Sequence, residues 1–323
     1  MTQPHSLLVT GGAGFIGSTF VAQCVARGCK VVVLDKLTYA GSRSNLEWIS
    51  SGWELVIGDI ADRPLVLKLL REHKVDALVN FAAESHVDNS ISGPAAFIDT
   101  NIGGTFQLLE AAREYAKEKT DFRFLQISTD EVYGSLGATG KFSETTPYAP
   151  NSPYSASKAA ADHLVRAWHE TYGLDTITTH CTNNYGPRQH KEKLIPKIIS
   201  NALSGQPIPI YGKGENVRDW IYVTDHIDGI DLALQKGKLG ETYCFGGNAE
   251  LTNNEVVNII CETLDKVMPS KEGSYKRLIT YVADRPGHDL RYAIDDSKAK
   301  NELGFKVGAD FKARITETIS WYM

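Results

Sequence analysis

A tyrosine, a lysine and two neighbouring acids are the residues of this sequence best suited to moving protons. Tyr154 and Lys158 lie four residues apart, so a helix would place both side chains on one face. Upstream, a short apolar segment ends in Asp130 and Glu131. Adjacent carboxyl groups can divide acid and base work if their surroundings separate their pKa values. The pattern predicts an enzyme in which Tyr154 takes a proton from a hydroxyl group.

The spacing of tyrosine and lysine does not identify the site by itself, because Tyr115 and Lys119 repeat it. In a chain of this composition, about one tyrosine–lysine pair with this spacing is expected by chance. Tyr115 ends a polar helix and no reactive residue precedes it. We therefore expect Tyr115 to be structural and Tyr154 to be functional.

A glycine-rich turn near the start of the chain predicts a dinucleotide site. Gly11, Gly14 and Gly17 follow an apolar strand and open an apolar helix, the context in which backbone N–H groups bind a pyrophosphate. Asp35 ends the second strand, where a carboxylate accepts the ribose hydroxyls and repels a 2′-phosphate. NAD is therefore favoured over NADP, although the neighbouring Lys36 weakens the preference. Once NAD is bound, its positive nicotinamide and Lys158 are both expected to lower the pKa of Tyr154.

The elements that must position these residues follow a βα alternation. Continuous apolar runs indicate strands that helices cover on both faces. The expected strands are 7–10, 30–34, 54–57, 77–81, 123–127 and 176–181, and the expected helices are 15–27, 63–72, 95–117 and 155–172. The pattern predicts an α/β fold with a doubly wound parallel Rossmann sheet.

Beyond residue 183 the alternation weakens and proline and glycine become frequent, which indicates a smaller, discontinuous C-terminal lobe that binds the substrate. Segments 220–223 and 242–245 again resemble sheet strands. We therefore expect a nucleotide domain of residues 1–182 plus about 216–246, and a lobe of about 183–215 plus 247–323.

The composition of the chain limits the classes of molecule expected to bind it. The chain carries 34 basic and 39 acidic residues, a net charge of −5, and has no long run of either sign, so neither nucleic acid nor a membrane is expected as a partner. The five cysteines include no Cys-x-x-Cys pair, which argues against a disulfide framework and a metal cluster. No signal peptide or apolar span is apparent, so the expected location is the cytoplasm.

Several short stretches of the sequence resemble those of a known enzyme family. The glycine turn and the Tyr154/Lys158 pair resemble the extended short-chain dehydrogenase/reductases. Within them, DKLTYAG (35–41), AAESHVD (82–88), STDEVYG (128–134), TNNYGP (182–187) and DRPGHD (284–289) resemble the dTDP-glucose 4,6-dehydratases, an NDP-sugar dehydratase family. The acid pair is the most specific element, because related sugar epimerases usually lack it.

The resemblance implies a hydro-lyase that dehydrates an NDP-glucose, with dTDP-glucose preferred and NAD recycled. It implies that Glu131 removes the C5 proton, Asp130 protonates the C6 oxygen, and Thr129 binds the C4 oxygen. Tyr154 and Lys158 complete the catalytic set. The alternatives are an NDP-sugar 4-epimerase, a dehydratase of UDP- or CDP-glucose, and a noncatalytic NAD-binding regulator.

The turn and the resemblance together imply a set of cofactor contacts: Gly11, Gly14, Phe15, Ile16, Gly17, Asp35, Lys36, Asp59, Ile60, Phe81, Ala82, Ala83, Ser85, Thr100, Tyr154, Lys158 and Asn184. The implied substrate contacts are Ser85, Thr129, Asn183, Lys193, Leu194, Pro209, Tyr211, Arg218, Asn253, Arg285 and His288.

The sequence departs from the family at two places. His190-Lys191 stands where the family commonly has Phe-Pro, and Asn89 where it often has arginine. The first change is expected to alter the approach to the nucleotide. By analogy with the family, the chain is expected to form a homodimer through its long helices 95–117 and 155–172.

Overall fold

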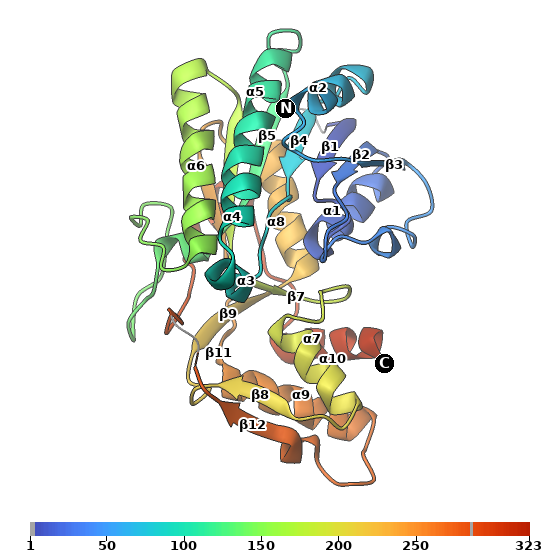
Figure 1. The fold of residues 1–323 in the computed structure, drawn as a ribbon, viewed down its shortest axis with the longest axis vertical. Coiled ribbons are helices and arrows are strands. Elements are labelled where there is room, and N and C mark those ends of the chain that lie inside the picture. Colours follow the sequence, from blue (N-terminus) through green and yellow to red (C-terminus); the bar gives the residue numbers. More distant parts are fainter. Residues whose placement is uncertain (1–3, 285–286) are drawn as a thin grey trace.

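The computed structural model describes residues 4–284 and 287–323, and its centre is a parallel sheet (Figure 1). Seven strands lie in the order β10-β6-β5-β4-β1-β2-β3, all parallel. They are β1 (Ser6–Thr10), β2 (Lys30–Asp35), β3 (Trp53–Ile57), β4 (Ala77–Asn80), β5 (Arg123–Thr129), β6 (Thr176–Cys181) and β10 (Thr242–Phe245). The expected Rossmann sheet is confirmed.

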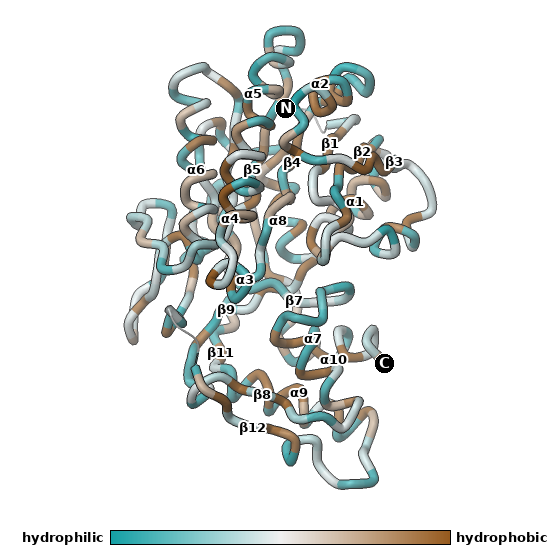
Figure 2. Tube along the Cα trace, in the orientation of Figure 1, coloured by the Kyte–Doolittle hydropathy of each residue, from teal (hydrophilic) through white to brown (hydrophobic). Residues whose placement is uncertain are grey.

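Helices cover both faces of this sheet. One face carries α1 (Phe15–Ala26) and α8 (Val223–Lys236), and the other carries α2 (Arg63–Glu72), α5 (Thr105–Tyr115) and α6 (Pro153–Tyr172). Successive strand residues enter opposite cores: Leu7 and Val9 pack with α1, whereas Leu8 packs with α2 and α5. This two-sided burial explains the continuous apolar runs, and Figure 2 shows hydrophobic strands beside hydrophilic helix ends and loops.

The expected helix 95–117 is interrupted. Its observed parts are α4 (Ala95–Phe97), a π-helical stretch (Ile98–Gly104) and α5, preceded by the short α3 (Val87–Ser92). At Gly104, a Cβ atom would lie 2.5 Å from the side chain of Ile60, so a larger residue would not fit against the loop after β3. Periodicity does not reveal such a widened turn, which is often found beside functional sites.

The second lobe lies below the carboxyl ends of the strands in Figure 1. It contains α7 (Leu194–Leu203), β8 (Ile208–Tyr211), α9 (Asn253–Val267), β12 (Ile279–Val282) and α10 (Phe311–Tyr322) around its own apolar core. A parallel pair, β8 and β12, forms one edge.

A three-stranded sheet joins the two halves. It has the order β11-β9-β7, formed by β7 (Asn183–Tyr185), β9 (Val217–Tyr222) and β11 (Glu250–Thr252). The strand expected at 220–223 is therefore present but lies outside the seven-stranded sheet, and Val223 begins α8. Trp220 packs in the lobe core while Ile221 packs against the Rossmann sheet, so β9 contributes to both. The domain boundaries themselves remain a prediction.

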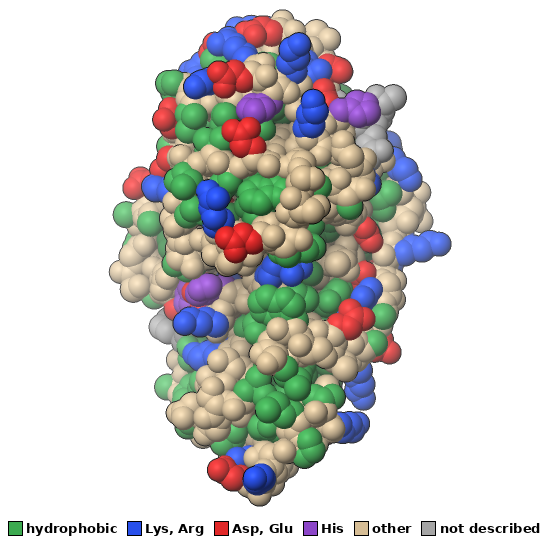
Figure 3. All heavy atoms as spheres, turned by 90° about the vertical axis from the view of Figure 1, so that its right-hand side faces the viewer, with side chains coloured by type: hydrophobic (Ala, Val, Ile, Leu, Met, Phe, Trp, Pro, Cys, Tyr) green, Lys and Arg blue, Asp and Glu red, His purple; other side chains and the backbone are tan. Residues whose placement is uncertain are grey.

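The surface and the cysteines complete the description. Acidic and basic side chains are interspersed on the face shown in Figure 3. All five cysteines are buried and free. Within residues 4–284 and 287–323, no cluster of three or more His, Cys, Asp or Glu side chains is arranged to hold a metal ion. None of the helices described is long and apolar enough to cross a bilayer.

Candidate active site

One cavity of about 820 Å³ lies between the strand ends and the lobe. Its wall contains the glycine turn, the end of β5, the start of α6 and the segment that leads into α7. All but one of the residues expected to contact cofactor or substrate, or to act in catalysis, line this cavity. The exception, Arg285, lies outside the described residues. Tertiary structure thus brings together residues that are distant in sequence.

The glycine turn leaves room for a ligand beside the first turn of α1. Gly11 has a φ of +65°, and a Cβ there would lie 2.6 Å from the backbone nitrogen of Ala82. A Cβ on Gly17 would lie 2.4 Å from the carbonyl oxygen of Gly11. The turn is therefore compact only because both residues lack side chains, and it directs the N-terminus of α1 into the cavity. This cradle fits the pyrophosphate of a dinucleotide.

Asp35 is held in place by the same turn. Its carboxylate accepts hydrogen bonds from the backbone N–H groups of Ala13 (2.9 Å) and Leu37 (2.8 Å), and it lines the cavity at the end of β2. Lys36 is paired with Asp59, at 2.6 Å. The charge next to Asp35 is therefore compensated, which removes the ambiguity about a 2′-phosphate that Lys36 introduced and leaves an environment that fits NAD.

The chain turns at the end of β5, as two neighbouring acids facing one ligand require. Thr129 ends the strand in an extended conformation and its Oγ1 accepts a hydrogen bond from the backbone N–H of Glu131 (3.3 Å), which starts a 3₁₀ turn. Both Asp130 and Glu131 consequently line the cavity. Asp130 is 1% exposed, and its Oδ2 has no hydrogen-bond partner among the described residues.

The buried carboxyl group has an unusual protonation state. Burial, together with the charge of Glu131, raises the pKa of Asp130 to about 8. Desolvation disfavours a charged carboxylate, and a second acid nearby adds to the effect. At neutral pH, Asp130 is therefore an acid that can donate a proton.

Tyr154 and Lys158 stand at the beginning of α6. Ser152 caps this helix through a reciprocal pair of hydrogen bonds with Ser155, and Pro153 occupies its first turn. Lys158 donates a hydrogen bond from Nζ to the carbonyl oxygen of Ile127 (2.7 Å), so the lysine is anchored to β5.

The pKa of Tyr154 differs from the expectation for the chain alone. Burial and the nearby carboxyl groups of Glu131 and Asp130 raise this pKa well above its ordinary value. The ammonium of Lys158 does not outweigh them, because burial also lowers the pKa of the lysine. The sequence shows the spacing of tyrosine and lysine but not the burial of both side chains.

Tyr115 has the structural role expected of it. Its ring is buried and its hydroxyl donates a hydrogen bond to the carbonyl oxygen of Val75 (3.1 Å). Lys119 pairs with Asp76 and Asp121 instead of approaching a ligand. This pair lies outside the cavity wall.

On the lobe side, polar residues face the cavity from several elements. Arg218 on β9 donates to the carbonyl oxygens of Val217 (2.8 Å) and Asp289 (3.0 Å), and its guanidinium lies over the Tyr292 ring. His288 pairs with Asp284, at 2.7 Å. The other described residues expected at the substrate also line the wall: Ser85, Thr129, Asn183, Lys193, Leu194, Pro209, Tyr211 and Asn253.

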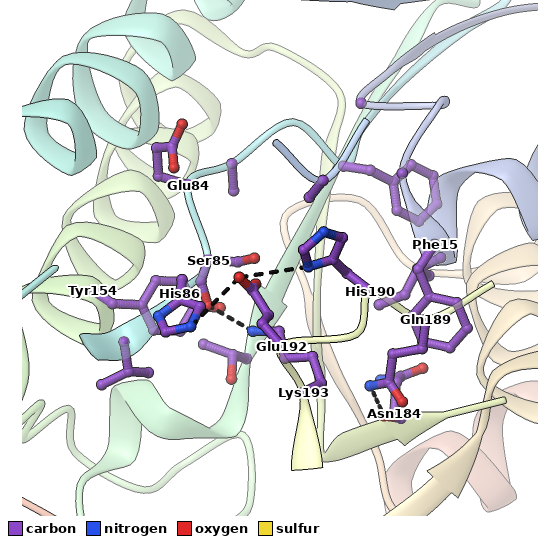
Figure 4. Close-up of a pocket in the computed structure, with 18 of the residues that line it drawn as sticks. Phe15, Glu84, Ser85, His86, Tyr154, Asn184, Gln189, His190, Glu192 and Lys193 are labelled. Carbon is purple, nitrogen blue, oxygen red and sulfur yellow. Dashed lines mark hydrogen bonds and ion pairs between the residues drawn. The ribbon is translucent and has the colours of Figure 1, made fainter. Parts of the chain in front are cut away.

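The segment with the unusual His190-Lys191 forms part of the wall of this cavity. Figure 4 shows Glu192 between His86 and His190, with Lys193 directed toward Ser85. The structure therefore places the departure beside the loops after β2 and β4, which carry the expected cofactor contacts.

Two positioning residues were not predicted. Asn101, in the π-helical stretch, exchanges hydrogen bonds with the backbone of Glu84 and donates to Ser157 on α6, at 2.8 Å. Thr182 donates from Oγ1 to the carbonyl oxygen of Asp219 (2.8 Å), and its proximity to Asp130 opposes the rise of the pKa of that carboxyl group. An asparagine in a helix carries no distinctive sequence signal, and Thr182 was noted only as the first residue of the TNNYGP run (182–187).

Known proteins resemble this chain over almost its full length. Residues 8–318 match the GDP-mannose 4,6 dehydratase family. The dTDP-glucose 4,6-dehydratase of Xanthomonas campestris pv. campestris (strain B100) is 58% identical over 98% of this chain and 92% of its own. For dTDP-glucose 4,6-dehydratase 1 of Escherichia coli (strain K12), the identity is 53% at the same coverage.

Solved structures show the same relationship. DesIV, a dTDP-glucose 4,6-dehydratase from Streptomyces venezuelae with NAD and TYD bound, has a TM-score of 0.91 and 47% identity, covering 98% of this chain and 96% of that one. A UDP-glucose 4-epimerase from Thermotoga maritima has a TM-score of 0.89 but 28% identity, with 98% of each chain covered. The fold is thus shared with epimerases, whereas the sequence is closer to the dehydratases. The chain belongs to the dTDP-glucose 4,6-dehydratase family.

Proposed function

We propose that this protein catalyses the NAD-dependent 4,6-dehydration of an NDP-glucose, preferably dTDP-glucose, to the NDP-4-keto-6-deoxyglucose. The observation that carries the proposal is the acid pair at the end of β5, where a buried, protonated Asp130 and the neighbouring Glu131 line one cavity with Tyr154. A 4-epimerase shares Tyr154 and Lys158 but has no elimination step that needs two acids. The identity to the dehydratases favours the same choice.

The glycine turn, Asp35 and the loops after β3 and β4 would hold NAD together with Thr100, Tyr154, Lys158 and Asn184. When bound, NAD supplies positive charge beside Tyr154, accepts the hydride from C4 of the sugar and returns it to C6. The presence of NAD in the DesIV structure supports NAD as the cofactor of this site.

The side chains at the end of β5 and the start of α6 divide the proton transfers. Tyr154 accepts the proton of the C4 hydroxyl while Lys158 stabilises the phenolate and Thr129 holds the C4 oxygen. Glu131 then takes the C5 proton, made acidic by the C4 carbonyl. Asp130 protonates the C6 oxygen, so the C6–O bond breaks and water leaves. Glu131 returns a proton to C5 as C6 is reduced, and Tyr154 and Asp130 regain their starting states by proton exchange.

The lobe would bind the nucleotide diphosphate. Arg218 and Arg285 suit the pyrophosphate, because a guanidinium can make paired hydrogen bonds with phosphate oxygens. Asn183, Lys193, Leu194, Pro209, Tyr211, Asn253 and His288 surround the remaining space. Thymine is the preferred base on the evidence of the relatives.

We further propose that the protein acts in the cytoplasm as a homodimer. The α5/α6 side presents apolar side chains to the surface, with Ile98 48%, Phe106 39% and Tyr172 50% exposed. A second copy of this chain would cover them. Sedimentation of the wild type and of Phe106→Asp tests the assembly, with a dimer expected for the first and a monomer for the second.

Mass spectrometry of the purified protein with dTDP-glucose tests the reaction. The product is expected to be lighter by one water, and dTDP-glucose deuterated at C4 is expected to yield deuterium at C6. An unchanged mass would overturn the dehydratase proposal, and an inverted C4 hydroxyl would identify an epimerase. Competition among dTDP-, UDP- and CDP-glucose in one vessel establishes the nucleotide preference.

A further inference from the structure

A single segment ties the substrate lobe to the cofactor half of the cavity. Residues 188–193, here called the strap, run from the end of the β7 region into α7. On the lobe side, the strap is held by Tyr322, whose hydroxyl donates to the carbonyl oxygen of Gln189 (2.6 Å), and by the Gln189 amide, which donates to the carbonyl oxygen of Asn184 (2.8 Å). The strap is thus anchored where it leaves the lobe.

At its first residue the strap contacts the loop after β2. Arg188 has a φ of +68°, a conformation that is unfavourable for a residue with a Cβ. Its guanidinium lies 4.0 Å from the centroid of the Trp48 ring, the geometry of a cation–π contact. The ring is itself oriented, because Trp48 Nε1 donates to the carbonyl oxygen of Asn45 (2.8 Å).

This contact continues to the glycine turn. The side-chain amide of Asn45 donates to the carbonyl oxygen of Ala13 (2.8 Å), between Gly11 and Gly14. A chain of direct contacts therefore links Arg188, through Trp48 and Asn45, to the backbone that fits the pyrophosphate. The strap is fastened to the part of the site that holds the cofactor.

The far end of the strap contacts the loop after β4. Glu192 Oε2 lies 3.4 Å from His86 Nε2 and 3.5 Å from His190 Nδ1. His86 Nδ1 accepts a hydrogen bond from the backbone N–H of Asn89 (3.3 Å), which leaves a proton on Nε2 to face Glu192. Lys193 donates from Nζ to the carbonyl oxygen of Ser85 (2.9 Å), and Figure 4 shows these side chains meeting across the cavity.

The cavity wall contains strap residues Gln189 to Lys193 on one side and the glycine turn, Asp35 and Ser85 on the other. The strap and the expected dinucleotide contacts thus line the same cavity, and the strap is fastened to the loops after β2 and β4 that carry several of those contacts. We propose that the strap is a clasp that retains NAD, closed by Arg188 on Trp48 at one end and by Glu192 on His86 at the other. The inference rests on the proposed function, in which the hydride leaves C4 and returns to C6, so the cofactor must stay through the whole turnover.

Release of NAD then requires the clasp to open, and weakening one end is expected to raise the rate of release rather than the rate of binding. Because the Trp48 ring is 50% exposed, the cation–π contact corresponds to about 2- to 5-fold in that rate. Trp48→Ala and Arg188→Ala are each expected to release NAD faster by this factor. The double variant is expected to be no faster than either single one, because both remove the same contact.

The test uses protein loaded with NAD and freed of excess by rapid gel filtration. Released NAD is trapped by alcohol dehydrogenase with ethanol, and the ultraviolet absorbance of the NADH formed reports the rate. Trp48→Phe keeps an aromatic face and is expected to restore slow release. Arg43→Ala removes an exposed arginine from the same loop and serves as the matched control, with unchanged release expected.

The outcomes separate this inference from the proposed function. Absence of water loss from dTDP-glucose would overturn the proposed function itself. If water is lost but wild-type protein retains no NAD, the clasp is refuted and the proposed function stands. If it retains NAD but Trp48→Ala and Arg188→Ala release NAD at the wild-type rate, the clasp is refuted. Should Trp48→Ala fail to fold by circular dichroism, Arg188→Gln and Trp48→Phe decide the question: release must be fast in the first and slow in the second.

Discussion

Replacement of Asp130 by asparagine tests the central feature of the site. The side chain is 1% exposed, and burial together with Glu131 raises its pKa to about 8. At pH 7 about 90% of Asp130 is therefore protonated and at pH 9 about 10%, because each pH unit from the pKa changes the ratio tenfold. Wild-type turnover is expected to fall about tenfold for each pH unit well above 8.

Asp130→Asn keeps the size of the side chain but removes the proton that leaves with the C6 oxygen. A positioned general acid contributes about 10²- to 10⁴-fold, so turnover at pH 7 is expected to drop by that factor. The remaining activity is expected to lose the fall above pH 8, because the titrating acid is gone. The assay is the initial rate of water loss from dTDP-glucose, measured by mass spectrometry across the pH range.

The same substitution has a signature in stability. A carboxyl group whose folded-state pKa exceeds its unfolded value stabilises the folded state fully at pH values below the unfolded pKa, and this contribution is lost as the pH rises through the folded pKa. Between pH 7 and pH 9, the wild type should therefore lose on the order of 1 kcal/mol of unfolding free energy relative to Asp130→Asn. Urea unfolding at both pH values measures the difference.

Asp121→Asn is the control, because Asp121 is an exposed acid away from the cavity. It is expected to leave both pH profiles unchanged. If Asp130→Asn kept the rate and the pH dependence of the wild type, the assignment of Asp130 as the acid at the C6 oxygen would be refuted.

Three further outcomes follow from the site. Glu131→Gln is expected to stop elimination but leave some C4 oxidation, so the absorbance of NADH should build up without loss of water; normal turnover would show that Glu131 is not the base at C5. Gly17→Ala places a Cβ 2.4 Å from the carbonyl oxygen of Gly11. It is expected to lower the unfolding free energy by about 1–3 kcal/mol, measured by urea unfolding. It is also expected to weaken NAD retention, measured by the NAD content of the purified protein. Unchanged stability would contradict the tight packing of the turn. Asp35→Asn keeps the shape of the side chain but removes the charge that repels a 2′-phosphate. The ratio of the affinities for NAD and NADP, measured by titration, is therefore expected to fall about tenfold, which corresponds to about 1.4 kcal/mol. An unchanged ratio would exclude Asp35 as the discriminating group.

Local patterns predicted much of this protein. Runs of mainly apolar or β-branched residues located all seven strands of the Rossmann sheet, including 242–245, to within about two residues at each end, since helices cover these strands on both faces. The glycine spacing located the cofactor turn, because only glycine allows the backbone to approach so closely at Gly11 and Gly17. The residues expected to form one site line one cavity, with Arg285 outside the described residues.

Other features depend on contacts between distant segments. The pairing of β9 with β7 and β11 was not predicted, because an apolar run does not specify its neighbours. The π-helical stretch was not predicted, and the direction of the Tyr154 pKa reflects burial among acids from another element. The contact of Arg188 with Trp48 joins two loops with no shared sequence signal.

The sequence by itself determined which chemical groups are present and which local elements carry them, because spacing and hydrophobic periodicity act over a few residues. Only the tertiary structure decided how those groups behave. Enclosure in the cavity removes water from Asp130, so the adjacent acids differ in exposure and Asp130 stays protonated at neutral pH. Packing of the lobe against the strand ends likewise brings the strap to the wall of the cavity that holds the expected cofactor contacts. Dielectric environment and long-range contact are properties of the folded chain, and no stretch of sequence encodes them alone.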